Sequence, residues 1–170
     1  MKLQARAHSA PPSAAFAGVK NAVAAVKGKK GTKLTVVSAL ALDQQESKGY
    51  KMTNNMGGVV DKILDYKLLG EDEVRKQLKD YTIIRPGVLL GGKGKGPEDI
   101  ELNIGDTIGG GLTRDELANV VVASLSNKNS QGKTVEVYRV SNRQKLMPNY
   151  AEKSGKESRG GTWEKLWDGI

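Results

Sequence analysis

The stretch Tyr81-Thr-Ile-Ile-Arg85, followed at once by Pro86-Gly87, decides the fold of this chain. Its β-branched and aromatic residues predict a buried strand, which we expect to end at the proline and glycine. Upstream, Leu34-Thr-Val-Val-Ser38 is a second β-branched run and predicts a second strand. Downstream, residues 134–140 alternate apolar and polar side chains, which predicts a half-covered strand at the edge of a sheet.

Helical patterns separate and flank these strands. From Phe16 onward, apolar residues at helical spacing predict a helix that Gly28 stops. Residues 59–78 predict a long helix, and Thr113-Arg-Asp-Glu116 has the form of a capping box that begins another helix, continuing to Leu125. This alternation of helices and strands is typical of a parallel sheet with flanking helices, so we predict the α/β class.

The remaining segments look poor in core residues. Residues 43–58 are polar and predict a loop, and residues 91–111 are glycine-dense and predict little core. Within the latter, residues 91–96 are interpreted as a mobile surface loop that closes over a ligand. Trp163 and Trp167 are four residues apart, which predicts a short docking helix whose rings serve as packing anchors.

Length and composition exclude several classes of protein. The chain has 170 residues, which corresponds to one domain, and no apolar run approaches the ~20 residues that a membrane span needs. It contains no cysteine and a single histidine, His8. Disulfides, thiolate metal sites, histidine-rich metal sites and cysteine nucleophiles are therefore excluded, and we predict no metal site.

The positive charge is concentrated at the N-terminus. Of the 27 basic residues, seven lie in residues 1–33, which hold none of the 19 acidic residues, so the rest of the chain is nearly balanced. A balanced body does not resemble a groove that neutralises phosphates, and aromatic stacking residues are scarce. Nucleic-acid association is therefore only a third alternative. Residues 1–15 are typical of either a transit-peptide remnant or a disordered tail, and residues 16–170 form the predicted domain.

The glycine-rich segment does not match a known phosphate loop. After Gly87, Gly92-Lys93 superficially completes the P-loop spacing, but Gly94 stands where a serine or threonine is needed. A dinucleotide-binding G-x-G-x-x-G pattern fails because Pro97 replaces its third glycine. We therefore expect no phosphate loop here.

Four segments, in order and spacing, resemble an atypical short-chain dehydrogenase/reductase of the NmrA-like, NAD(P)-binding Rossmann group. They are Leu34-Thr-Val-Val-Ser38, Leu64-Asp-Tyr-Lys-Leu-Leu-Gly-Glu71, Tyr81-Thr-Ile-Ile-Arg-Pro-Gly87 and Leu112-Thr-Arg-Asp-Glu-Leu-Ala118. The resemblance covers the C-terminal half of such a protein. It implies a partial Rossmann-like parallel sheet without the first βαβ unit, which carries the glycine motif.

The resemblance also implies roles for individual residues. Ser38 matches a serine at a strand end that faces the nicotinamide, and Lys67 matches the lysine that contacts the nicotinamide ribose. These two are the implied catalytic residues, and both also bind the cofactor. Pro86, Gly87 and Val88 match a turn whose backbone approaches the nicotinamide. The usual tyrosine proton donor is replaced by Ile63. For Ser38 and Lys67, a strand-end serine and a solvated helix lysine remain open as alternatives.

The resemblance implies an NAD(P)-binding protein that is not an efficient dehydrogenase by itself. We expect weak or absent binding of NADP or NAD, because the glycine-motif unit has no counterpart here. The alternative is a non-catalytic structural or assembly subunit of a photosynthetic or respiratory complex. A protein partner, either a second copy or a larger assembly, is expected to cover the open edge of the strand at residues 34–38. A plastid or mitochondrial location would suit the acid-free leader, and a cytoplasmic one is the alternative.

Overall fold

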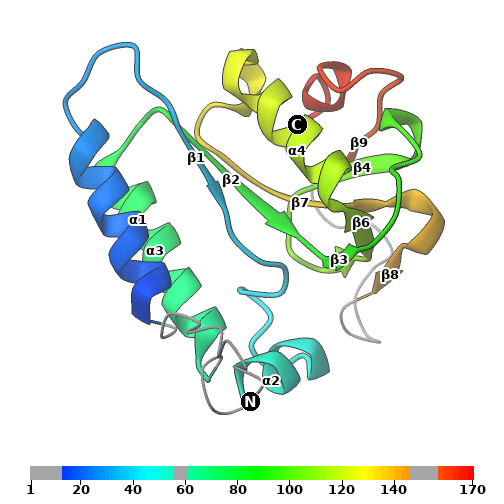
Figure 1. The fold of residues 1–170 in the computed structure, drawn as a ribbon, viewed down its shortest axis with the longest axis horizontal. Coiled ribbons are helices and arrows are strands. Elements are labelled where there is room, and N and C mark those ends of the chain that lie inside the picture. The colour runs from blue at the N-terminus through cyan, green and yellow to red at the C-terminus, as the bar shows by residue number, and fades with distance from the viewer. Residues whose placement is uncertain (1–12, 56–60, 146–156) are drawn as a thin grey trace, which may run out of the picture.

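The computed structural model describes residues 13–55, 61–145 and 157–170. Its helices are α1 (Ser13–Val26), α2 (Lys48–Asn54), α3 (Ile63–Gln77) and α4 (Arg114–Ser126). Its strands are β1 (Leu34–Val37), β2 (Tyr81–Pro86), β3 (Val88–Leu90), β4 (Ile100–Asn103), β5 (Ile108–Gly109), β6 (Gly111–Thr113), β7 (Lys133–Arg139), β8 (Gln144–Lys145) and β9 (Glu157–Ser158). Figure 1 shows their arrangement. Residues 1–12 of the basic leader lie outside the described residues, so its predicted role has no structural counterpart here.

The main sheet has five strands in the order β1-β2-β7-β4-β9. Strands β1, β2 and β7 are parallel, and Val36 lies directly opposite Ile83 in the register of the first pair. Strands β4 and β9 add an antiparallel extension. The predicted α/β class, with a largely parallel sheet and flanking helices, is therefore confirmed.

One strand lies elsewhere in the sheet than predicted. Strand β7 is central, between β2 and β4, and not at an edge. Its polar residue Glu136 is 1% exposed and accepts hydrogen bonds from Asn103 and from the backbone of Asp106. The alternation of apolar and polar residues therefore reflects a buried polar network on one face, because that face does not contact solvent.

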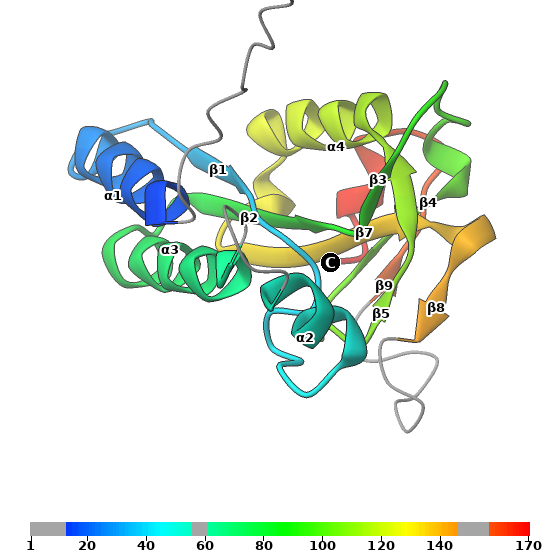
Figure 2. The ribbon, with the colours of Figure 1, turned by 60° about the horizontal axis from the view of Figure 1, so that its bottom comes forward.

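Helices cover both faces of the sheet. Figure 2 shows α4 on one face and α3 on the other, and α1 packs against α3. Neighbouring residues of β2 point to opposite faces, so Ile83 joins the core under α1 and α3, whereas Ile84 joins the core under α4. A Cβ on Gly70 would lie 3.4 Å from the Val19 side chain, which is van der Waals contact, so α1 packs directly over this mid-helix glycine.

The helix termini follow the sequence signals. Helix α1 ends before Gly28, which has a positive φ of 78°. The predicted capping box is confirmed, because the Thr113 side chain accepts from the Glu116 amide and the Glu116 carboxylate accepts from the Thr113 amide. The long helix begins at Ile63, and residues 56–60 lie outside the described residues. No helix in the described ranges is long and apolar enough to cross a membrane.

The segments predicted to lack structure contain elements. Residues 43–58 include α2, and residues 91–111 include β4, all of whose residues are buried. Strand β2 ends at Pro86, and strand β3 begins directly after Gly87 and pairs in parallel with β6 in a separate two-stranded sheet. The predicted docking helix is a single 3-10 turn, Lys165–Trp167, in which Trp167 is fully buried as an anchor. Residues 91–95 are exposed, as predicted for that loop.

Candidate functional site

A cavity of about 410 Å³ lies beyond the carboxyl ends of β1 and β2. Because these strands are parallel, both ends reach the same edge of the sheet. Open α/β sheets bind their ligands in a crevice at this edge. The volume lies within the range of roughly 300–1,000 Å³ that is common for small-molecule sites. Its lining residues are Ala39, Leu40, Ala41, Gly49, Met52, Thr53, Leu64, Pro86, Gly87, Val88, Gly110 and Gln144.

The three residues Pro86, Gly87 and Val88 all line this cavity. The Pro86 carbonyl accepts a hydrogen bond from the Leu40 amide at 3.1 Å, and the Val88 amide donates to the Gly110 carbonyl at 3.1 Å. A Cβ on Gly87 would lie 1.7 Å from that carbonyl oxygen, so only glycine fits. Since these polar groups are occupied, the turn offers the cavity mainly its apolar surface.

Ser38 and Lys67 lie together beside the cavity, although neither is part of its lining. The Lys67 ammonium donates to the Ser38 carbonyl at 3.3 Å. Burial lowers the pKa of Lys67 below its ordinary value, and the charge of Glu71 opposes that shift. The Ser38 hydroxyl is buried and has no hydrogen-bond partner among the described residues. A buried hydroxyl without a partner is unusual, and a ligand group that reached it would supply the missing hydrogen bond.

The N-terminus of α3, which borders the cavity, is already capped. The Asn54 side-chain oxygen accepts from the amides of Leu64 and Asp65 at 3.0 and 3.3 Å. Tyr50 donates its phenolic proton to the Asp65 carboxylate. Burial and this carboxylate raise the pKa of Tyr50 to about 12. The helix terminus is therefore not an open anion site, and Tyr50 is a poor proton donor at neutral pH.

A buried ionic network supports the wall of the cavity. Arg85, next to Pro86, is 1% exposed, and its guanidinium contacts four carboxylates. The hydrogen bonds to Glu71 and Asp43 are as short as 2.7 and 2.6 Å, and the ion-pair distances to Asp106 and Glu136 are 3.4 and 3.8 Å. None of these five charged residues is part of the described lining of the cavity. Among the described residues, no group of three or more acidic or histidine side chains is arranged to hold a metal ion.

Asp106 connects this network to the lining of the cavity. Its carboxylate accepts from the Ala41 and Asp43 amides, each at 2.7 Å, so it fixes the backbone of the segment that lines one side. Burial raises the pKa of Asp106 to about 6, although Arg85 opposes the shift. Burial and the nearby charge of Asp106 raise the pKa of Glu136 to about 8.

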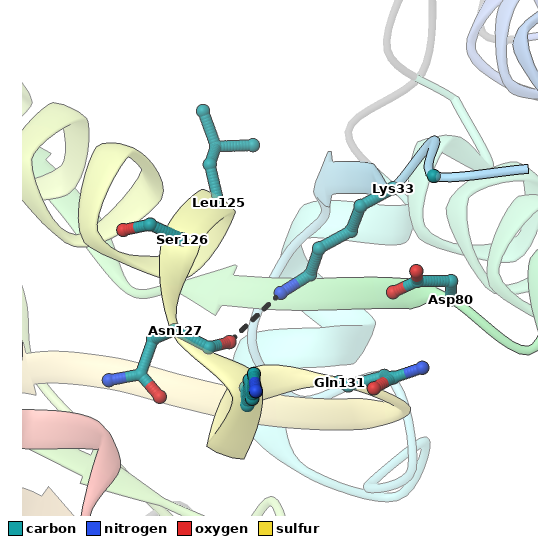
Figure 3. Close-up of a pocket in the computed structure, with 8 residues that line it drawn as sticks. Lys33, Asp80, Leu125, Ser126, Asn127 and Gln131 are labelled. Carbon is teal, nitrogen blue, oxygen red and sulfur yellow. Dashed lines mark hydrogen bonds between the residues drawn. The ribbon is translucent and has the colours of Figure 1, made fainter.

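A second cavity, of about 190 Å³, lies at the opposite, amino-terminal edge of the strands. Figure 3 shows Lys33 reaching across it to the Asn127 carbonyl, at 3.3 Å. The same ammonium donates to the Ser124 carbonyl at 2.5 Å and to the Ser130 hydroxyl. Because Lys33 uses its three protons at the C-terminal end of α4, we assign it a structural role.

The residues at the first cavity fit the nicotinamide end of a dinucleotide. An apolar volume adjoins a buried hydroxyl and a half-buried ammonium, and the carboxyl edge of the strands is where such ligands bind. Leu40, Met52 and Asp106 also shape this region, although sequence analysis did not identify them. Of these three, only Met52 lies in an element with a sequence signal. It belongs to helix α2, whose N-cap residue Ser47 accepts from the Tyr50 amide at 3.1 Å, and serine is a common N-cap residue.

Comparisons with known proteins also relate this chain to NAD(P)H-binding proteins. A family model described as NAD(P)H-binding matches residues 4–128. A Bacillus halodurans structure assigned as an NAD-dependent epimerase/dehydratase has a TM-score of 0.60 and 22% identity, with 79% of this chain and 60% of that chain covered. The oxidoreductase ylbE of Lactococcus lactis has a TM-score of 0.53 and 21% identity, with 72% of this chain and 52% of that chain covered. These structures share the fold, and the match spans 60% and 52% of their lengths. No curated protein sequence is significantly similar to the chain.

Proposed function

Because the chain belongs to the NAD(P)H-binding family, we propose that it is an atypical short-chain dehydrogenase/reductase-like protein whose cavity takes the nicotinamide end of NAD or NADP. The observation that carries this proposal is the position of the cavity at the carboxyl edge of β1 and β2. Pro86, Gly87 and Val88 would contact the ring, and Lys67 and the free hydroxyl of Ser38 would contact its ribose side. A nicotinamide bound there would supply hydride transfer.

We propose that this chain binds the dinucleotide weakly by itself and is not an efficient dehydrogenase. The sequence contains no G-x-G-x-x-G turn to hold the pyrophosphate, and Ile63 stands at the position of the usual tyrosine acid. Tyr50, whose pKa is raised to about 12, is no substitute for that acid. The half-buried Lys67 would then act mainly as a hydrogen-bond donor to the ligand.

A titration of the full chain with NADPH, followed by nicotinamide fluorescence, tests this proposal. We expect a Kd well above 1 μM for the wild type, and a loss of about tenfold, equivalent to ~1.4 kcal/mol, in Lys67→Met. Lys76→Met, at an exposed lysine of the same helix, is the matched control and should bind like the wild type.

No saturable binding at millimolar NADPH would contradict a dinucleotide function. Micromolar affinity would contradict only the expectation of weak binding. Equal affinities of the Lys67 and Lys76 variants would contradict the role given to Lys67. The same titration with NADH shows which of the two dinucleotides the chain prefers.

We propose as the second candidate that the chain is a non-catalytic structural or assembly subunit. The observation that favours it is the outer edge of β1, which pairs only with β2 among the described strands. Val37 on this strand is 43% exposed, and Val122 and Leu125 on α4, which packs against β1, are 65% and 53% exposed. An open strand edge beside apolar side chains is a surface that proteins usually cover. A plastid or mitochondrial complex would be one setting for such a partner.

A further inference from the structure

The segment that follows β1 carries backbone strain in one wall of the carboxyl-edge cavity, the cavity beyond the carboxyl ends of β1 and β2. Ala39, Leu40 and Ala41 form this wall. Ala41 has a φ of 70°, in the left-handed region that residues with a Cβ rarely adopt, and it is buried. A residue other than glycine keeps such a conformation only where its surroundings hold it there. The shape of the wall therefore depends on the contacts of Ala41.

The Asp106 side chain provides two of these contacts. Asp106 lies in the loop between β4 and β5 and is fully buried. Its two carboxylate oxygens accept from the Ala41 amide and from the Asp43 amide, each at 2.7 Å. An ionised carboxylate offers an acceptor to both amides, whereas protonation leaves one oxygen as a poorer acceptor that also carries a proton. The charge of Asp106 therefore decides how firmly the strained residue is held.

The charged groups around Asp106 bring this ionisation close to neutral pH. Burial raises the pKa of Asp106 to about 6, although the Arg85 cation and the two amides oppose the shift. Burial also raises the pKa of Glu136 to about 8, so Glu136 is protonated where Asp106 titrates. The charged residues of the packed elements are Asp43 after β1, Arg85 on β2, Glu136 on β7, and Glu71 and Arg75 on α3.

From this geometry we propose that Asp106 is the positioning residue of the carboxyl-edge cavity, and that its ionised carboxylate holds residues 39–41 in the shape that receives the nicotinamide end of the dinucleotide. The proposal rests on the proposed function, because the ligand is the one given to this cavity. Asp106 is not part of the described lining, so it acts through the Ala41 and Asp43 backbone. Protonation loosens the wall, so dinucleotide binding weakens as the pH falls.

An NMR pH titration of the ¹⁵N-labelled full chain without ligand tests the contact with the wall. We expect the amide signals of Ala41 and Asp43 to move between pH 7 and pH 5 with a common midpoint near 6, and to stay constant in Asp106→Asn. The Ser141 amide, which donates to the Asp99 carboxylate, is the internal control. Although burial opposes it, hydrogen bonds from Ser141 hold the pKa of Asp99 below its ordinary value, so the Ser141 signal should not move.

A titration of the same samples with NAD⁺, whose own charge is constant between pH 5 and pH 7, tests the effect on binding. We expect the wild-type affinity to fall about tenfold from pH 7 to pH 5, since the ionised fraction of Asp106 falls by that factor. Asp106 has a φ of 54°, which asparagine tolerates, so Asp106→Asn leaves the backbone unstrained.

We expect Asp106→Asn to bind NAD⁺ at least fivefold more weakly than the wild type at pH 7, with no further loss at pH 5. Asp168→Asn is the matched control, because Asp168 is exposed and an amide oxygen can still accept from Asn129. It should keep the wild-type affinity and the wild-type pH dependence.

A rescue experiment separates positioning from a general loss of folding. Glycine adopts a positive φ without strain, so Ala41→Gly should restore at least twofold of the affinity that Asp106→Asn loses. Ala39→Gly makes the same change in the same wall at a residue without a positive φ, and should restore none. With Asp106 intact, Ala41→Gly should lose less than the wild type between pH 7 and pH 5, a readout that needs no change at Asp106.

The two proposals fail separately in these experiments. Movement of the Ala41 and Asp43 signals without NAD⁺ binding at either pH would contradict the dinucleotide function and support the contact between Asp106 and the wall. Equal NAD⁺ affinity at pH 7 and pH 5, equal affinities of the two asparagine variants, or equal rescue by the two glycine variants would each overturn the positioning role and leave the dinucleotide function intact.

Discussion

Most of the buried charged side chains among the described residues lie around Arg85. Its guanidinium is surrounded by carboxylates of four different chain segments, at Asp43, Glu71, Asp106 and Glu136. Three of these carboxylates are buried, whereas the Asp43 side chain is 55% exposed, and Arg75 adds one further cation through Glu71. The surplus acid is relieved by protonation, because burial and Asp106 raise the pKa of Glu136 to about 8.

This raised pKa makes the stability of the fold depend on pH. Between pH 4.5, the ordinary value, and about 8, the unfolded chain loses the proton of Glu136 while the folded protein keeps it. The folded state then binds more protons, so the free energy of unfolding falls as the pH rises through this window. One such proton changes it by about 1.4 kcal/mol per pH unit.

We therefore predict that Glu136→Gln removes most of this pH dependence, since glutamine resembles the protonated carboxyl and can still accept from the Asp106 amide. The measurement is urea unfolding between pH 7 and pH 8, where Asp106, with a pKa of about 6, is already mostly ionised. Glu98→Gln, at an exposed glutamate, is the control and should keep the wild-type slope. A variant at position 136 with an unchanged slope would show that Glu136 is already ionised in the folded protein.

At the scale of elements, long and capped patterns were predictable from the sequence. Strands β1 and β2, the α1 helix and the capping box of α4 all follow from local periodicity and turn chemistry. Helix α2 was missed because its seven residues are too short for a periodic signal. Strand β4 was missed because Glu101 and Asn103 are polar, although both are fully buried by partners distant in sequence.

The candidate site was predictable only where it is local in sequence. Pro86, Gly87 and Val88 form one continuous turn, and all three line the cavity. The remaining lining comes from segments that only the fold brings together, such as Leu40, Gly49 and Gln144. No single-sequence pattern contains that proximity, because it depends on how α2 and β8 pack around the ends of two strands.

The open edge of β1 leads to a prediction about association. The amides of Leu34 and Ser38 donate toward β2, so alternation directs the Val37 amide to the outer edge. We predict that the chain self-associates or joins a larger assembly through this edge. Val37→Pro should abolish self-association with only a modest loss of thermal stability, because the amide that proline removes faces outward and proline is tolerated on edge strands. Leu69→Lys changes an exposed apolar residue of α3 instead and should associate like the wild type.

Light scattering of the wild type and both variants at equal concentration measures this association. A dimer or larger species that becomes monomeric only in Val37→Pro is the expected result. A monomeric, fully folded wild type at all concentrations would contradict the role given to the β1 edge.

At the scale of the whole molecule, the two edges of the parallel strands are chemically different. The amino-terminal edge is closed by Lys33, whose ammonium ties the start of β1 to the end of α4. The carboxyl edge has the larger cavity, with an apolar lining and the buried, unpartnered hydroxyl of Ser38 beside it. This asymmetry is the physical reason to place the dinucleotide at the carboxyl edge.

The most direct test is a backbone amide NMR titration of the ¹⁵N-labelled full chain with NADPH up to millimolar concentration. We predict that the shifts concentrate at Ser38, Leu40, Gly49 and Val88, around the carboxyl-edge cavity, and that Ser126 and Gln131 at the opposite edge remain unchanged. Shifts concentrated at the Lys33 cavity, or no shifts at any amide, would contradict the account.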